Sequence, residues 1–105
     1  MARLRHAEPV RPRSANEWRS FWHQGGEAEL RGVLRDVWSP LRDVSDEGCV
    51  PQAERIALLL GSSAPVRALA GELGRIRAEL GEGPDAEADR EAAEKVSEWF
   101  RTRSR

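Results

Sequence analysis

The fold is decided by residues 30–41, which read Leu30-Arg31-Gly32-Val33-Leu34-Arg35-Asp36-Val37-Trp38-Ser39-Pro40-Leu41. Apolar side chains stand at positions 30, 33, 34, 37 and 38, and this spacing is typical of one face of an α-helix. Pro40 disfavours helical backbone at the residue before it. The stretch therefore predicts an amphipathic helix that ends close to Trp38 and carries that side chain into the core.

The segment before this helix carries a second helical signal. Ser14-Ala15-Asn16-Glu17 has the pattern of a capping box, in which the serine oxygen and the glutamate satisfy amides of the first turn. Three aromatic residues follow at helical spacing, namely Trp18, Phe21 and Trp22. Gly25-Gly26 then predicts a break, because a glycine inside a helix costs about 1 kcal/mol relative to alanine.

The segment after residue 41 predicts a loop over residues 41–51 and three more helices. They span about 52–60, 64–80 and 86–101, with Gly61 and the loop 81–85 between them. The apolar stripe of the helix 64–80 contains Val66, Leu69, Ala70, Leu73, Ile76 and Leu80. The stripe of the last helix contains Asp89, Ala92, Ala93, Val96, Trp99 and Phe100. Because no strand alternation appears, the fold class is all-α, a small bundle of four to five helices.

Gly71 and Gly74 lie in the middle of the helix 64–80. They either weaken this helix locally or mark a close approach of another helix.

Length and charge predict one helical domain with basic ends. The chain has 105 residues, the size of a single domain, and a net charge of −1. Residues 1–13 have no helical period and carry +3, so we expect a flexible, disordered basic arm. Residues 14–101 form the helical domain, and 102–105 form a disordered basic tail. Residues 14–100 carry −7, whereas 101–105 carry +3.

The sequence contains no catalytic, metal or cofactor signature. Cys49 is the single cysteine, so it forms no disulfide within the chain and no multi-cysteine zinc site, and we expect a small buried hydrophobe. His6 and His23 have no ligand-forming residues at metal spacing around them. We therefore expect no enzyme, metal or cofactor. No apolar run spans a membrane and no secretory signal is visible, which predicts a cytoplasmic protein, and the excess of arginine over lysine is typical of a GC-rich bacterial genome.

Two groups of residues are candidates for binding a protein partner. Trp18, Phe21 and Trp22 are large anchors of the kind that dominate interfaces, although their helical spacing favours a place in the core. Asp43, Asp46 and Glu47 make the loop after Trp38 acidic and suited to a basic partner. The sequence does not indicate an oligomeric state.

An alternative function is weak DNA binding by a helix-turn-helix. The helix 52–60, a turn at residues 61–63 and the helix 64–80 have that layout. The second helix carries Arg67, Arg75 and Arg77, but Glu72 and Glu79 lie among them. Because the acidic body repels phosphate, binding of nucleic acid is the less favoured interpretation.

The run Leu34-Arg35-Asp36-Val37-Trp38-Ser39-Pro40-Leu41, the acidic loop, and Val50-Pro51 before the next helix resemble a family of small uncharacterised helical proteins. Their mark is a helix ending in Trp-Asp-Pro-Ile-Gly, and some are labelled YugE-like. Trp38, Pro40 and the apolar Leu41 match, whereas Ser39 replaces Asp and Arg42 replaces Gly. The resemblance covers about residues 28–80 and implies a helical fold, no known enzyme activity, and at most a partner-binding or toxin-neutralising role.

Taken together, these patterns predict a non-catalytic protein-interaction domain, immunity-like in the sense that the resemblance implies, which binds a basic protein through its acidic body.

Overall fold

The computed structural model describes residues 15–103, and in this range the chain forms helices and turns without any strand. The predicted all-α bundle is therefore confirmed. The expected arm at residues 1–13, the expected cap Ser14 and the last two residues of the tail lie outside the described range. The backbone of Trp18 belongs to the first helix, but its side chain is not among those described.

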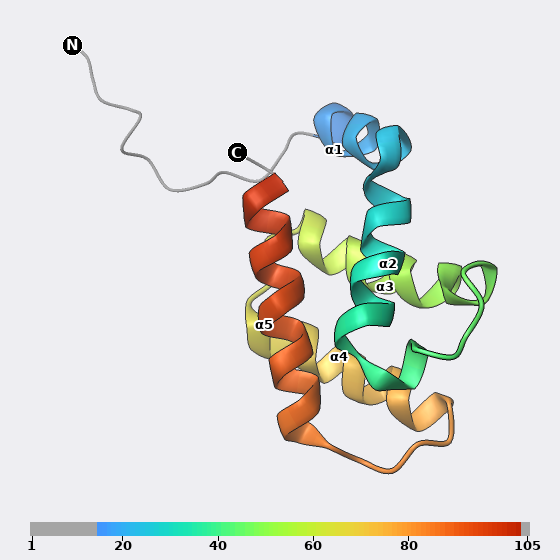
Figure 1. The fold of residues 1–105 in the computed structure, drawn as a ribbon. Coiled ribbons are helices and arrows are strands. Elements are labelled where there is room, and N and C mark those ends of the chain that lie inside the picture. Colours follow the sequence, from blue (N-terminus) through green and yellow to red (C-terminus); the bar gives the residue numbers. More distant parts are fainter. Residues whose placement is uncertain (1–14, 104–105) are drawn as a thin grey trace.

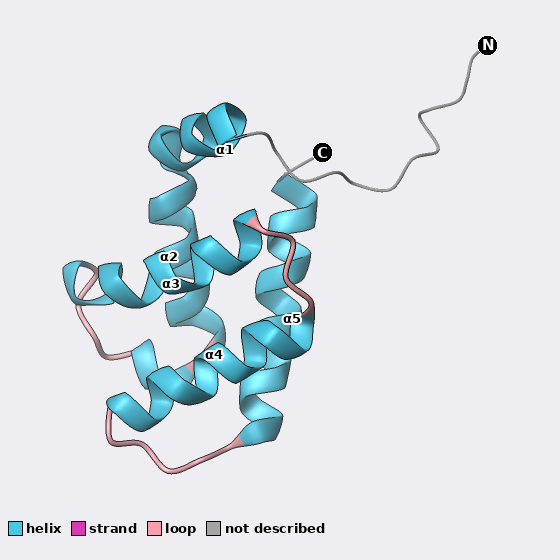
Figure 2. Cartoon of the chain, turned by 180° about the vertical axis from the view of Figure 1, so that it is seen from behind, coloured by secondary structure: helices cyan, strands magenta, loops and turns pink. Residues whose placement is uncertain are grey.

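Five α-helices make up this range: α1 (Ala15–Phe21), α2 (Glu27–Val37), α3 (Val50–Gly61), α4 (Val66–Glu79) and α5 (Ala86–Arg103). Three short segments connect α1, α2 and α3: the π-helix η2 (Trp22–Gly26) and the 3-10 helices η3 (Ser39–Leu41) and η4 (Glu47–Cys49). Helices α2 and α5 stand side by side, and α3 and α4 cross behind them (Figure 1). Seen from the other side, α3 and α4 form the front layer (Figure 2).

The predicted break at Gly25-Gly26 is confirmed as a kink between α1 and α2. Gly25 has a φ of 111°, which L side chains rarely adopt. Gly26 lies against Phe21, since a Cβ on it would come within 2.6 Å of the phenyl ring. The kink turns α1 across the end of the bundle, so that Phe21 reaches the last turns of α5.

The core lies between the two layers and follows the predicted stripes except at Leu80, which is 36% exposed and follows the last residue of α4. Its largest fully buried side chains come from all four long helices and from η3, and include Trp38, Leu30, Leu34, Leu41, Ile56, Leu69, Leu73, Ile76 and Val96. Trp38 is only 1% exposed, which confirms its predicted place in the core. Cys49 is fully buried, as expected of a small hydrophobe in this position.

Several helix ends differ from the sequence expectation. Helix α3 begins at Val50 and not at about 52, and α4 spans Val66–Glu79 and not about 64–80. Helix α3 includes Gly61, and the left-handed residue after it is Ser63, with a φ of 61°. The amide of Ala64 closes this turn by donating to the Leu59 carbonyl at 2.9 Å. Helix α5 reaches Arg103, two residues beyond the expected end, and the Arg103 guanidinium pairs with Glu29 on α2 at 2.8 Å.

Candidate functional site

The aromatic residues near the N-terminus of the described range help to attach α1 to α5. Phe21 is 9% exposed, and its ring centroid lies 6.1 Å from that of Trp99 and 6.4 Å from that of Phe100. Trp22 is partly buried and packs against the core. These two side chains are thus already in contact with the rest of the domain, whereas the side chain of Trp18, the third predicted member, is not described.

The acidic loop after Trp38 is only partly available to a partner. Arg31 Nε donates to Asp46 Oδ2 at 3.0 Å, and this hydrogen bond raises the pKa of Arg31. Arg35 lies 3.9 Å from the same carboxylate, so Asp46 holds the loop to α2. Asp43 and Glu47 are exposed, and no described residue forms an ion pair with either of them.

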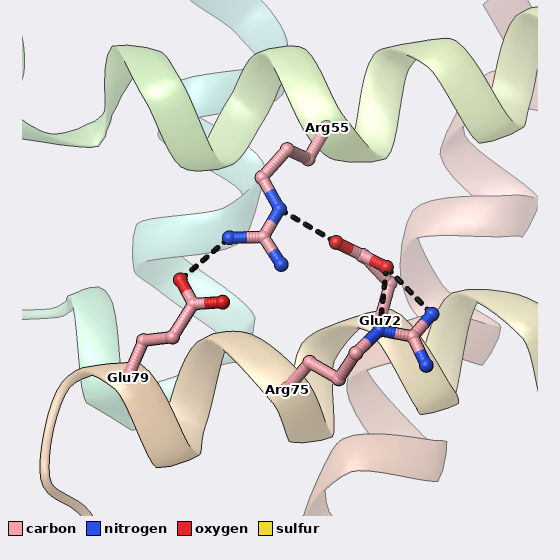
Figure 3. A network of polar contacts seen from close by, with 4 residues as sticks. All are labelled: Arg55, Glu72, Arg75 and Glu79. Carbon is pink, nitrogen blue, oxygen red and sulfur yellow. Dashed lines mark hydrogen bonds and ion pairs between the residues drawn. The ribbon is translucent and has the colours of Figure 1, made fainter.

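A polar network joins α3 to α4 (Figure 3). Arg55 on α3 donates to Glu72 through Nε and to Glu79 through Nη1, both at 2.6 Å. Arg75 donates to Glu72 Oε1 at 2.7 Å. Burial alone would raise the pKa of Glu72, but the hydrogen bonds from Arg75 and Arg55, together with their charges, outweigh it and lower this pKa. The network therefore holds the two helices together, and it occupies the guanidinium of Arg75.

A buried ion pair lies where α2, α4 and α5 meet. Asp89 on α5 is 4% exposed and Arg77 on α4 is 6% exposed. Arg77 Nε donates to Asp89 Oδ1 at 2.9 Å, and the indole Nε1 of Trp38 donates to the same oxygen at 2.8 Å. The guanidinium also lies 5.6 Å from the centroid of the Trp38 ring, within the range of a cation–π contact.

The position of Arg77 corrects one sequence-based expectation. The sequence groups Arg77 with Arg67 and Arg75 as cations on the helix that would read DNA, but the Arg77 guanidinium is inside the domain. Its Nη1 donates to the carbonyl of Gly83 at 3.3 Å, and its Nη2 lies 2.8 Å from Asp89 Oδ1 and is enclosed without hydrogen-bond geometry. A signal was present in the sequence: Arg77 follows Leu73 by four residues on the α4 stripe, and Asp89 lies on the stripe of α5.

A cavity of about 350 Å³ opens beside this ion pair, between α4 and the start of α5. Its walls are mostly apolar and come from Ala70, Gly71, Gly74, Arg77, Pro84, Asp85, Ala86 and Asp89. The size is at the lower end of small-molecule sites, which occupy roughly 300–1,000 Å³. The two glycines of α4 thus leave space at this wall, which the sequence pattern by itself did not reveal.

Exposed carboxylates lie around the same end of the molecule. Glu82 and Asp85 in the loop, and Glu87 and Glu91 on α5, are exposed, and no residue in 15–103 forms an ion pair with any of them. Asp85 uses Oδ1 to accept a hydrogen bond from the Ala88 amide at 3.1 Å, which caps α5. We call these four residues the acidic rim. The rim adjoins the cavity through Asp85.

In residues 15–103, no three or more His, Cys, Asp or Glu side chains are arranged to hold a metal ion. His23 is exposed, and burial raises the pKa of the Cys49 thiol above its ordinary value of 9.0. No helix of the described range has both the length and the apolar character that crossing a membrane requires. Comparison of the chain with known protein families, with curated proteins and with solved structures finds no match.

Proposed function

We propose that this chain is a non-catalytic, cytoplasmic protein-interaction domain that binds a basic protein. The observation that carries the proposal is a difference between the basic and the acidic side chains of the described range. Many of the described arginines are engaged in pairs within the domain, such as Arg31, Arg55, Arg75 and Arg77. Among residues 15–103, the four carboxylates of the acidic rim form no ion pair, and they are exposed.

An uncompensated acidic surface supports this function for an electrostatic reason. Complementary charge raises the rate at which a basic partner is encountered and selects against acidic competitors. The cavity beside the rim offers a place where one partner side chain can be enclosed, as interface anchors usually are. An immunity-like role, in which the basic partner is a toxin, is the form of this proposal that the resemblance to YugE-like proteins implies.

The DNA-binding alternative has less support from the arrangement of α4. Phosphate binding needs cations free to face the backbone of the nucleic acid. Arg77 is enclosed in the core and Arg75 is held by Glu72. Arg67 is the α4 arginine that is exposed and, among described residues, has no ion pair. A single free cation gives weak attraction without sequence selection.

The test compares two variants with equal changes of net charge, using the full chain. Glu87→Lys/Glu91→Lys reverses two charges of the acidic rim, and Asp36→Lys/Glu54→Lys reverses two exposed carboxylates on α2 and α3. We expect the wild type and the second variant to retain one basic protein stoichiometrically from cells that express the chain, and the first to lose it. The affinity for that protein should fall steeply between about 0.05 and 0.5 M salt.

Two outcomes would contradict the proposal. One is equal binding of the partner by both double variants, because the acidic rim would then be irrelevant. The other is submicromolar, sequence-selective binding to duplex DNA at about 0.15 M salt that is lost in Arg67→Ala, which would favour the helix-turn-helix interpretation.

A further inference from the structure

We infer that the cavity between α4 and the start of α5 is a socket for a lysine side chain of the basic partner. The inference rests on the proposed function and specifies where and how the partner is recognised. Two features of the cavity support it: a carboxylate oxygen of the buried ion pair and the apolar walls around that oxygen.

The two carboxylate oxygens of Asp89 differ in their partners. Oδ1 accepts hydrogen bonds from both Arg77 and Trp38. Among residues 15–103, no donor is hydrogen-bonded to Oδ2. This second oxygen lies on the side of Gly74, since a Cβ on Gly74 would be 3.5 Å from it, and both residues line the cavity. One carboxylate oxygen therefore remains as an acceptor at the cavity wall.

The charged side chains at the cavity leave it with an excess of negative charge. Arg77 and Asp89 cancel each other, and the donors of Arg77 are either bonded or enclosed. Asp85 adds a negative charge to the wall, and Glu82 and Glu87 precede and follow it along the chain. Although the N-terminus of a helix attracts anions, the first turn of α5 already contains acidic residues that compensate this dipole. The charge of the site thus favours a cation.

The geometry at Asp89 favours a lysine over an arginine. A guanidinium binds a carboxylate best when it can approach both oxygens in a bidentate pair, and here Oδ1 is already occupied. An ammonium is a compact charge that needs one good acceptor, so it fits Oδ2 alone. The methylene chain of a lysine also packs well on apolar walls, which Gly71, Gly74, Pro84 and Ala86 supply.

The test is an NMR titration of the isotope-labelled full chain with Nα-acetyl-lysine-N-methylamide. We expect saturable shifts at the amides of Gly71, Gly74 and Ala86, with a millimolar dissociation constant. The same compound with its Nε acetylated keeps the shape but loses the charge, and it should bind about tenfold more weakly or worse, which corresponds to about 1.4 kcal/mol or more. The arginine analogue should bind more weakly than lysine.

A matched pair of variants distinguishes an effect on binding in the cavity from an effect on the stability of the fold. Gly74→Ala places a methyl group 3.5 Å from Oδ2, an ordinary contact that covers the acceptor. Gly32→Ala makes the same chemical change on α2, where the new Cβ meets nothing within 4 Å. Both changes favour helix formation. Only Gly74→Ala should weaken binding of the lysine analogue, by about tenfold.

The outcomes distinguish this inference from the proposed function. Equal capture of the basic partner by wild type and Gly74→Ala would overturn the socket while leaving the acidic rim as the binding surface. Saturable shifts at the same amides with acetate or phosphate, and not with the lysine analogue, would also overturn it, because the cavity would then be an anion site. Specific binding of the analogue without any basic partner would support the socket and contradict the proposed function.

Discussion

Replacing Trp38 tests whether the junction of α2, α4 and α5 stabilises the domain as the geometry indicates. Trp38→Phe keeps an aromatic ring but removes the indole N–H that donates to Asp89 Oδ1 at 2.8 Å. A hydrogen bond to a charged group contributes about 1.5–3 kcal/mol. The smaller ring also leaves part of a fully buried volume empty, which adds roughly 1 kcal/mol. We therefore expect a loss of about 2–4 kcal/mol in the free energy of unfolding.

The expected change is large enough to measure by thermal denaturation followed by far-UV circular dichroism. For a domain of this size, each kcal/mol lowers the melting temperature by about 4–8 °C, so Trp38→Phe should lower it by at least about 8 °C. Trp38→Ala adds the loss of the ring, and large core truncations of this kind cost about 3–5 kcal/mol before the hydrogen bond is counted. That is a large part of the about 5–15 kcal/mol available to a domain.

Trp99→Phe is the matched control. Trp99 is only partly buried, and its Nε1 donates to Glu29 Oε1 at 3.1 Å on the exposed side of the bundle. Because solvent competes for this contact, its loss should cost less than about 1 kcal/mol. If Trp38→Phe and Trp99→Phe melt within about 2 °C of each other, the buried hydrogen bond does not have the assigned effect and the reasoning is refuted.

Three further predictions use other features. Asp89→Ala should destabilise the domain by about 3–5 kcal/mol because it leaves the charge of Arg77 buried without a partner. In urea denaturation, the double variant Asp89→Leu/Arg77→Met should be at least about 1 kcal/mol more stable than Asp89→Ala. The opposite order would show that water solvates Arg77 in the single variant. Since the pKa of Glu72 is lowered in the folded state, the stability that its charge contributes is present above its ordinary pKa of 4.5 and is lost as the pH falls through the lower folded value. Glu72→Gln should therefore flatten the acid limb of the stability profile, and an unchanged limb would contradict this. Because Cys49 is fully buried and burial raises the pKa of its thiol, a thiol reagent at neutral pH should modify the native chain much more slowly than the denatured chain. Comparable rates would mean that Cys49 is accessible.

The fold could be predicted from the sequence because its helices have regular apolar stripes. The spacing at Leu30, Leu34 and Trp38 was sufficient to place one side chain in the core and to end α2 near Pro40. The left-handed turn residue was not predictable in the same way. Gly61 is the residue type that favours this conformation, but closure of the turn by the Ala64 amide places it on Ser63.

The candidate site could be predicted only in part, because residue type and position gave opposing signals. Asp89 stood on the α5 stripe and Arg77 at a position that continues the α4 stripe, yet an arginine and an aspartate are rarely buried unless they are paired. Their pairing depends on how α4 and α5 cross, which no local pattern specifies. The cavity depends on the same crossing, together with the missing side chains of Gly71 and Gly74.

The Trp38–Asp89 hydrogen bond also has a consequence for the order of folding. Arg77 and Asp89 are 12 residues apart, whereas Trp38 and Asp89 are 51 apart. Closing the shorter segment costs less chain entropy, so we expect the α4–α5 hairpin to form in the transition state and α2 to dock after it. In stopped-flow experiments, Trp38→Phe should then act mainly on the unfolding rate, whereas changes within the hairpin should slow folding. The indole would thus form its hydrogen bond late in folding and slow the unfolding of the native domain.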